Sequence, residues 1–142
     1  MIHPSWRSRP IILAVATFIT AACSSVPSRQ ALTLTLSPSN VTAPADGQVQ
    51  FTATATYNMP PSPVTPAAAT WGVIDGAGQH TTAVSIDNNG LAQCSSEASG
   101  VYTVGAWILQ FSTPPDSVCN VATPFGNPCG DSILTTTQLT CP

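Results

Sequence analysis

The clearest hydrophobic pattern in the chain runs from Val49 to Tyr57. Every second residue in this stretch is apolar or aromatic, and the residues between them are Gln50 and three threonines. A period of two places alternate side chains on opposite faces of a β-strand. The pattern therefore predicts a strand with one face in a hydrophobic core.

The same period, in shorter runs, predicts further strands along the chain. Leu32, Leu34 and Leu36 alternate with threonines, and Tyr102, Val104, Ala106 and Ile108 form another inward-facing set. The segments between the runs carry turn and loop residues, including four prolines between positions 59 and 66. We expect strands at 32–36, 49–57, 70–73, 84–86, 91–94, 102–108 and 133–139.

A tight hairpin is expected between Val84 and Cys94. Asn89 and Gly90 are the residues that most readily adopt the left-handed conformations of a tight turn. The run Asp87 to Gly90 also resembles the start of a calcium loop, but its glycine comes too early and no bidentate glutamate follows at the required distance. A β-turn is the better interpretation.

The predicted fold class is all-β. Seven short strands with turn signals and no helical period in the body indicate a seven-stranded antiparallel β-sandwich. Two sheets must stack face to face, because one amphipathic sheet would leave its apolar face in water.

The N-terminal segment resembles a bacterial lipoprotein signal. Arg7 and Arg9 precede an apolar run from Ile11 to Ile19, which is too short to span a bilayer. Small residues and then Cys23 follow, with Thr20 where leucine is usual. The resemblance implies a signal peptide at 1–22 and lipidation, including palmitate, at Cys23. The alternative is an ordinary secretory signal cleaved nearby.

Residues 23–31 are expected to be the lipidated cysteine and a flexible tether, and residues 32–142 the folded body. No aspartate follows Cys23 directly. The signal therefore favours the outer membrane, if the organism has one, with the body facing the periplasm or the cell surface.

The body resembles the bacterial Ig-like domain, group 2 family, from about Leu32 to Leu139. The resemblance rests on the order of several short motifs, none specific alone: Leu34-Thr35-Leu36-Ser37-Pro38, Gly47 to Ala55, Thr70-Trp71, Val84 to Leu91, and Gly100 to Ala106. Tyr102 also resembles the tyrosine corner of Ig folds. The resemblance implies an Ig-like β-sandwich, and it allows roles in adhesion or beside carbohydrate-active enzymes.

Charge excludes one class of partner. The chain has three basic residues, all arginines at or before position 29, and six carboxylates, all after it. Nucleic-acid binding needs lysine or arginine side chains to replace condensed counterions. We therefore expect no nucleic-acid partner and no basic patch that docks on anionic lipid.

Four cysteines remain after Cys23, and all four are expected to pair in an oxidising compartment. Strands alternate in direction, so Cys94 and Cys141 end strands at the same pole, while Cys119 and Cys129 share a loop at the opposite pole. We predict the disulfides Cys94–Cys141 and Cys119–Cys129. A zinc site is the competitor, but the cysteines lie at different poles and no CxxC spacing occurs.

Candidate chemistry is sparse, so we expect no enzyme, cofactor or metal site. His80 lies in a glycine-bearing loop, and no nucleophile motif surrounds any serine. A possible binding surface comprises Trp107, Phe111 and Phe125, with Trp107 expected to face outward. The alternative for Trp107 is cover by the loop at 113–131.

Two classes of function stay open. The first is a membrane-anchored, non-enzymatic Ig-like module for protein interaction or structural support at the bacterial cell envelope. The second is a carbohydrate-binding or adhesin module that uses exposed aromatic residues. The expected partners are the membrane, through Cys23, and an unknown envelope protein or glycan.

Overall fold

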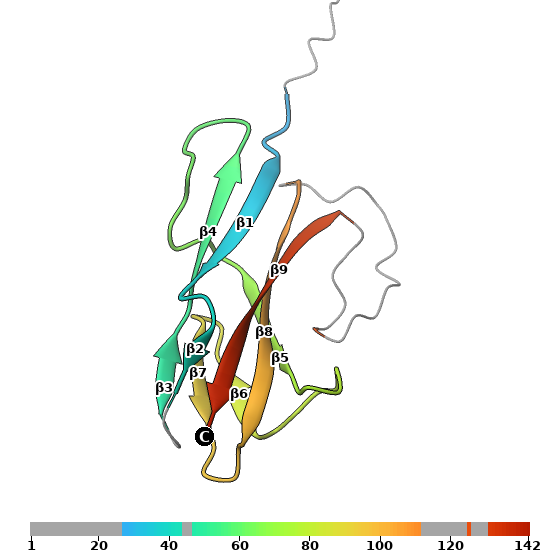
Figure 1. Cartoon of the computed structure of the whole chain (residues 1–142). Coiled ribbons are helices and arrows are strands. Elements are labelled where there is room, and N and C mark those ends of the chain that lie inside the picture. Colours follow the sequence, from blue (N-terminus) through green and yellow to red (C-terminus); the bar gives the residue numbers. More distant parts are fainter. Residues whose placement is uncertain (1–26, 44–46, 112–124, 126–130) are drawn as a thin grey trace, which may run out of the picture.

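The chain forms an all-β body. The computed structural model describes residues 27–43, 47–111, 125 and 131–142 (Figure 1). Nine strands and no helix lie in these residues. They are β1 (Ala31–Ser37), β2 (Val41–Thr42), β3 (Gln48–Gln50), β4 (Thr52–Tyr57), β5 (Thr70–Ile74), β6 (Val84–Ile86), β7 (Leu91–Cys94), β8 (Gly100–Leu109) and β9 (Ser132–Cys141).

The count exceeds the expected seven for two reasons. The run 49–57 is interrupted at Phe51, so it forms β3, which pairs with β7, and β4, which pairs with β1. β2 is only two residues long and pairs in parallel with β9. Two residues are too few to show a period, so the sequence pattern did not reveal β2.

The strands form three hydrogen-bonded sheets, with the orders β1-β4, β3-β7-β6 and β2-β9-β8-β5. β3 and β4 are consecutive, so the two smaller sheets follow one another along the same stretch of chain. Their core residues, such as Phe51 and Val84, cluster with Val104 and Leu139 of the four-stranded sheet. Apolar side chains of separate sheets thus share one interior, which is consistent with a β-sandwich.

Most predicted inward faces are buried. Tyr102, Val104, Ala106 and Ile108 of β8 are all buried, as the alternation predicts. Leu32 differs, because its side chain is 54% exposed. The pairing of β1 with β4 shifts register between Ala31 and Thr33, and this irregularity turns Ala31 inward in its place.

A disulfide joins β7 to β9, as predicted. The Cα atoms of Cys94 and Cys141 are 6.1 Å apart, within the usual disulfide range. Both residues are almost completely buried. Because β7 and β9 belong to different sheets, this bond links the two sides of the core. Cys23, Cys119, Cys129 and the expected signal peptide at 1–22 lie outside the described residues.

The end of the expected tether is part of the body. Gln30 N donates to Asn58 Oδ1 over 2.8 Å, and Asn58 N donates to Gln30 O over 3.0 Å. The guanidinium of Arg29 lies 3.7 Å from the centroid of the Tyr57 ring and donates to Pro61 O. Ala31 is fully buried in β1. The folded body thus begins before Leu32.

Among the described residues, there is no helix of the length and hydropathy required to cross a membrane.

Candidate functional site

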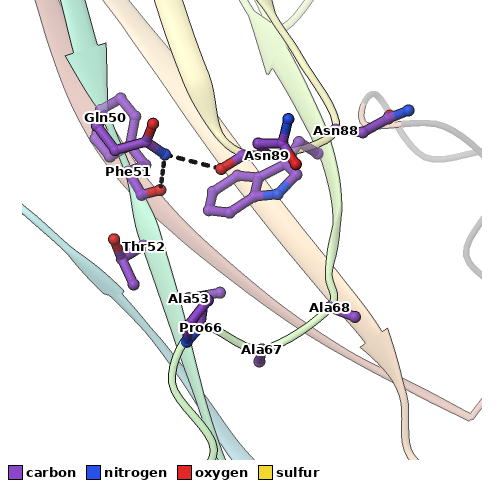
Figure 2. Close-up of a pocket in the computed structure, with 10 residues that line it drawn as sticks. Gln50, Phe51, Thr52, Ala53, Pro66, Ala67, Ala68, Asn88 and Asn89 are labelled. Carbon is purple, nitrogen blue, oxygen red and sulfur yellow. Dashed lines mark hydrogen bonds between the residues drawn. The ribbon is translucent and has the colours of Figure 1, made fainter.

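A groove of about 500 Å³ lies at the junction of β3 and β4. Its lining comes from three separate parts of the body, the β3–β4 junction, the segment before β5 with Trp71, and the turn between β6 and β7. Figure 2 shows Gln50 and Asn89 at one end and the segment Pro66–Ala68 at the other. The lining residues are Gln50, Phe51, Thr52, Ala53, Pro66, Ala67, Ala68, Trp71, Asn88 and Asn89.

The groove lies between two segments that pair with successive parts of β3 and β4 along the same edge. β7 pairs with β3 as far as Gln50, and Phe51 N then donates to Gly90 O over 2.9 Å. The segment before β5 takes over at Ala53, whose carbonyl accepts from Ala67 N over 2.8 Å. Between these two contacts, the described residues make no backbone hydrogen bond to this edge of the strand.

The Gln50 side chain bridges this edge to the hairpin turn. Its Nε2 donates to Phe51 O and to Asn89 O, both over 2.8 Å (Figure 2). Gln50 was predicted to point away from the core, and it is exposed. The outward phase of the strand thus places an amide at the rim of the groove.

Trp71 provides the aromatic wall of the groove. It lies on β5 and is half-buried. It packs against both clusters of buried residues in the core, one that includes Phe51 and Val104 and one that includes Ala53 and Ala106. Its indole fits closely against Gly90, because a Cβ built on Gly90 would be 2.8 Å from Trp71 Cζ2 and 2.6 Å from Phe51 O. The absence of a side chain at Gly90 therefore permits the position of Trp71.

The β6–β7 turn that carries Asn88 and Asn89 is held by Asp87. Asp87 Oδ1 accepts from Asn89 N and Leu91 N, each over 2.8 Å. The bond from Leu91 N and the bonds from Asn89 lower the pKa of this carboxyl below its ordinary value of 3.8. The hairpin is confirmed, with one correction: Gly90 has a positive φ of 82°, whereas Asn89 does not.

The predicted binding surface at Trp107 is only partly open. Trp107 is half-buried, and it pairs across the sheet with Leu134, which is 41% exposed. Leu109 is 46% exposed two residues further along β8. This outer face therefore does carry apolar surface, as expected from the alternation of β8.

Phe125 does not contribute an exposed ring to that surface. Its side chain is only 8% exposed. A Cβ built on Gly105 would be 2.7 Å from Phe125 Cδ1, so the ring lies directly on this glycine of β8. Phe125 covers the sheet here rather than offering a free platform. Phe111 is half-buried at a bridge with Gln30.

No group of three or more histidine, cysteine or acidic side chains is close enough to hold a metal ion in the part of the chain that the structure describes. His80 is exposed, and its backbone forms a bridge with Ile74. Neither residue lies at the groove.

The sequence pattern did not predict the groove or the position of Trp71 in its wall. Trp71 was predicted to face inward, which is correct. The groove itself depends on where two segments that are distant in sequence end beside β3 and β4.

No protein-family model and no curated protein matches the chain.

Proposed function

We propose that the chain is a lipid-anchored, non-enzymatic Ig-like module that binds a partner or supports an assembly at the bacterial cell envelope. The strand order supports the Ig-like part of this proposal, and the lipoprotein-like segment up to Cys23 supports the anchor. Ig domains place strands A, B, E and D in one sheet and C, F and G in the other. The orders β1-β4 with β3-β7-β6, and β2-β9-β8-β5, fit that division if β3 and β4 together are strand B.

A side-chain hydrogen bond also supports the Ig-like assignment. The Tyr102 hydroxyl donates to Ser99 O over 3.3 Å. A bond from this hydroxyl to backbone a few residues upstream is the feature that defines a tyrosine corner. The group 2 bacterial Ig-like family remains the proposed family, on the motifs quoted above.

The proposed anchor places the body close to the membrane. Asn58 Nδ2 donates to Ser28 O, which lies five positions after Cys23, and five residues span at most about 18 Å. Since Gln30 is bonded to Asn58, the loop after β4 lies on the same side as the anchor. We propose an outer-membrane location where the organism has such a membrane.

Binding, rather than catalysis, suits the groups that the body offers. The groove presents amides, a hydroxyl and an indole, and these groups recognise ligands without titrating near neutral pH. A carbohydrate-binding or adhesin role is the second candidate, and the exposed Leu109 and Leu134 beside Trp107 favour an aromatic and aliphatic surface for it. Nucleic acid is not a proposed partner.

The test of the proposal is a Cys23→Ala variant of the full-length chain, with Ser24→Ala as its matched control. We expect the wild type and Ser24→Ala in the membrane fraction, with incorporation of a palmitate analogue and cross-links to envelope components. Cys23→Ala should lose the label and leave the membrane fraction, because its lipid chains hold it there. Label and membrane retention in Cys23→Ala would contradict the anchor, and an absence of cross-links in the anchored protein would contradict the module.

A further inference from the structure

We propose that the groove at the junction of β3 and β4 binds a neutral sugar ring of a glycan. This inference goes beyond the proposed envelope module, and it places carbohydrate binding at the groove rather than at the surface beside Trp107. It depends neither on the lipid anchor nor on the Ig-like family.

The groove has the size and rigidity of a small-molecule site. Its volume of about 500 Å³ lies within the range of ~300–1,000 Å³ that is usual for such sites. Backbone bonds hold the surrounding segments in place, from Phe51 N to Gly90 O at 2.9 Å and from Ala67 N to Ala53 O at 2.8 Å. A ligand would therefore enter a site that is already formed, which lowers the ordering cost of binding.

Trp71 supplies a rigid apolar surface on which the C–H face of a sugar ring can pack. An indole combines a large contact area with few rotatable bonds. Trp71 packs against both core clusters and against Gly90, so its orientation is fixed before a ligand arrives.

The polar groups of the groove are uncharged. Gln50 offers its Oε1 as an acceptor, because its Nε2 already donates to Phe51 O and Asn89 O, whereas the Thr52 hydroxyl and the Asn89 amide can both donate and accept. Sugar hydroxyls also donate and accept, so the two sets match. The nearby Asp87 carboxylate is already occupied by the backbone of its own turn.

Other ligand classes fit less well. A phosphate or carboxylate needs arginine or lysine, and the one basic residue after the signal segment, Arg29, is engaged with Tyr57 and Pro61. A wholly apolar ligand would cover Gln50 Oε1 and the Thr52 hydroxyl and would offer them no hydrogen bond in place of water.

An extended peptide would need a free strand edge, which the groove does not offer. Gln50 Nε2 already occupies Phe51 O, and Ala67 N already occupies Ala53 O. In an extended strand the N–H and C=O of one residue point to the same side, so Ala53 N–H is directed to this edge. A single donor can contact one sugar hydroxyl but cannot pair with a strand.

The experiment uses the full-length chain in a detergent without a sugar headgroup, applied to an array of neutral and acidic glycans. We expect binding to neutral glycans. The best neutral glycan is then titrated calorimetrically against Thr52→Val and Asn89→Ala, each of which removes one polar group. Each should weaken binding about three- to tenfold, the value of one hydrogen bond.

Trp71→Phe should weaken binding by about tenfold through loss of stacking area. Gln138→Ala is the matched control, since this exposed amide lies on β9, outside the groove, and its removal should leave affinity unchanged. Thermal unfolding checks that each variant is folded. Asn89 is exposed and Thr52 is half-buried, and neither belongs to a core cluster, so Thr52→Val and Asn89→Ala keep the test valid if Trp71→Phe is unstable.

Several results would overturn the inference. They are a blank array, binding to acidic glycans only, unchanged affinity in both Thr52→Val and Asn89→Ala, or loss of binding in Trp107→Ala with all groove variants intact. A blank array would leave the proposed envelope module standing, because its cross-links and its lipid label are measured separately.

Discussion

At the scale of single residues, Gly90 connects the hairpin to the groove. Its φ of 82° is in the left-handed region, and a Cβ there would be 2.6 Å from Phe51 O and 2.8 Å from Trp71 Cζ2. We predict that Gly90→Ala lowers the free energy of unfolding, both through backbone strain at this positive φ and through crowding of the new Cβ. The backbone term is ~1–2 kcal/mol, and crowding adds ~1–3 kcal/mol.

Gly78→Ala separates the two causes. Gly78 has a similar φ of 76°, but a Cβ there would meet no atom within 4 Å. This variant should lose only the backbone term of ~1–2 kcal/mol. Urea unfolding of both variants measures the difference. Equal losses would show that Trp71 and Phe51 are not packed against Gly90 as described.

At the scale of elements, the alternation of apolar and polar residues predicted where strands occur, but it did not predict where a strand is interrupted or shifts register. The inward face of β8 and the β6–β7 hairpin follow directly from alternation and turn residues. The break at Phe51 does not follow from the sequence, because Phe51 keeps the alternation of its neighbours. Only the pairing strand changes there, from β7 beside β3 to β1 beside β4. The register shift at Ala31 is likewise a property of pairing rather than of the pattern.

The β6–β7 hairpin should respond to pH through Asp87. Hydrogen bonds from Leu91 N and Asn89 lower the pKa of this carboxyl in the folded chain. A lowered pKa means that Asp87 contributes stability above its ordinary pKa of 3.8, and that this contribution is lost as pH falls through the folded pKa.

We therefore expect Asp87→Asn to be less stable than the wild type near neutral pH, with the difference shrinking below pH 3.8. Thermal unfolding of both chains from about pH 6 to about pH 2 measures it. A difference that is constant over this range would show that the charge of Asp87 does not stabilise the turn.

At the scale of the whole molecule, the sequence predicted the all-β class and the Cys94–Cys141 bond but not the groove. Strand direction alone brings Cys94 and Cys141 to one pole, so simple topology sufficed for the disulfide. The groove requires the relative positions of Gln50, Trp71 and Ala67, which come from three separate parts of the chain. Alternation predicts the face of the strand on which each side chain lies. It does not predict where the segments that pair with a strand end, and the groove depends on those ends.

The Cys94–Cys141 bond should be the main covalent contribution to stability, because it closes a long loop and ties the two sides of the core together. A separation of 47 residues corresponds to about 4 kcal/mol on the chain-entropy model. We expect the double variant Cys94→Ala/Cys141→Ala to unfold at a clearly lower urea concentration than the wild type.

The double variant Cys119→Ala/Cys129→Ala is the matched control, since the predicted Cys119–Cys129 disulfide would close a much shorter loop and contribute less. Both Cys94 and Cys141 are buried, so a mild reductant should leave the folded wild type oxidised and act only as the chain unfolds. Thiol labelling along the urea transition measures this. Rapid reduction of Cys94–Cys141 in the absence of urea would mean that the two sides of the core separate readily in the folded protein.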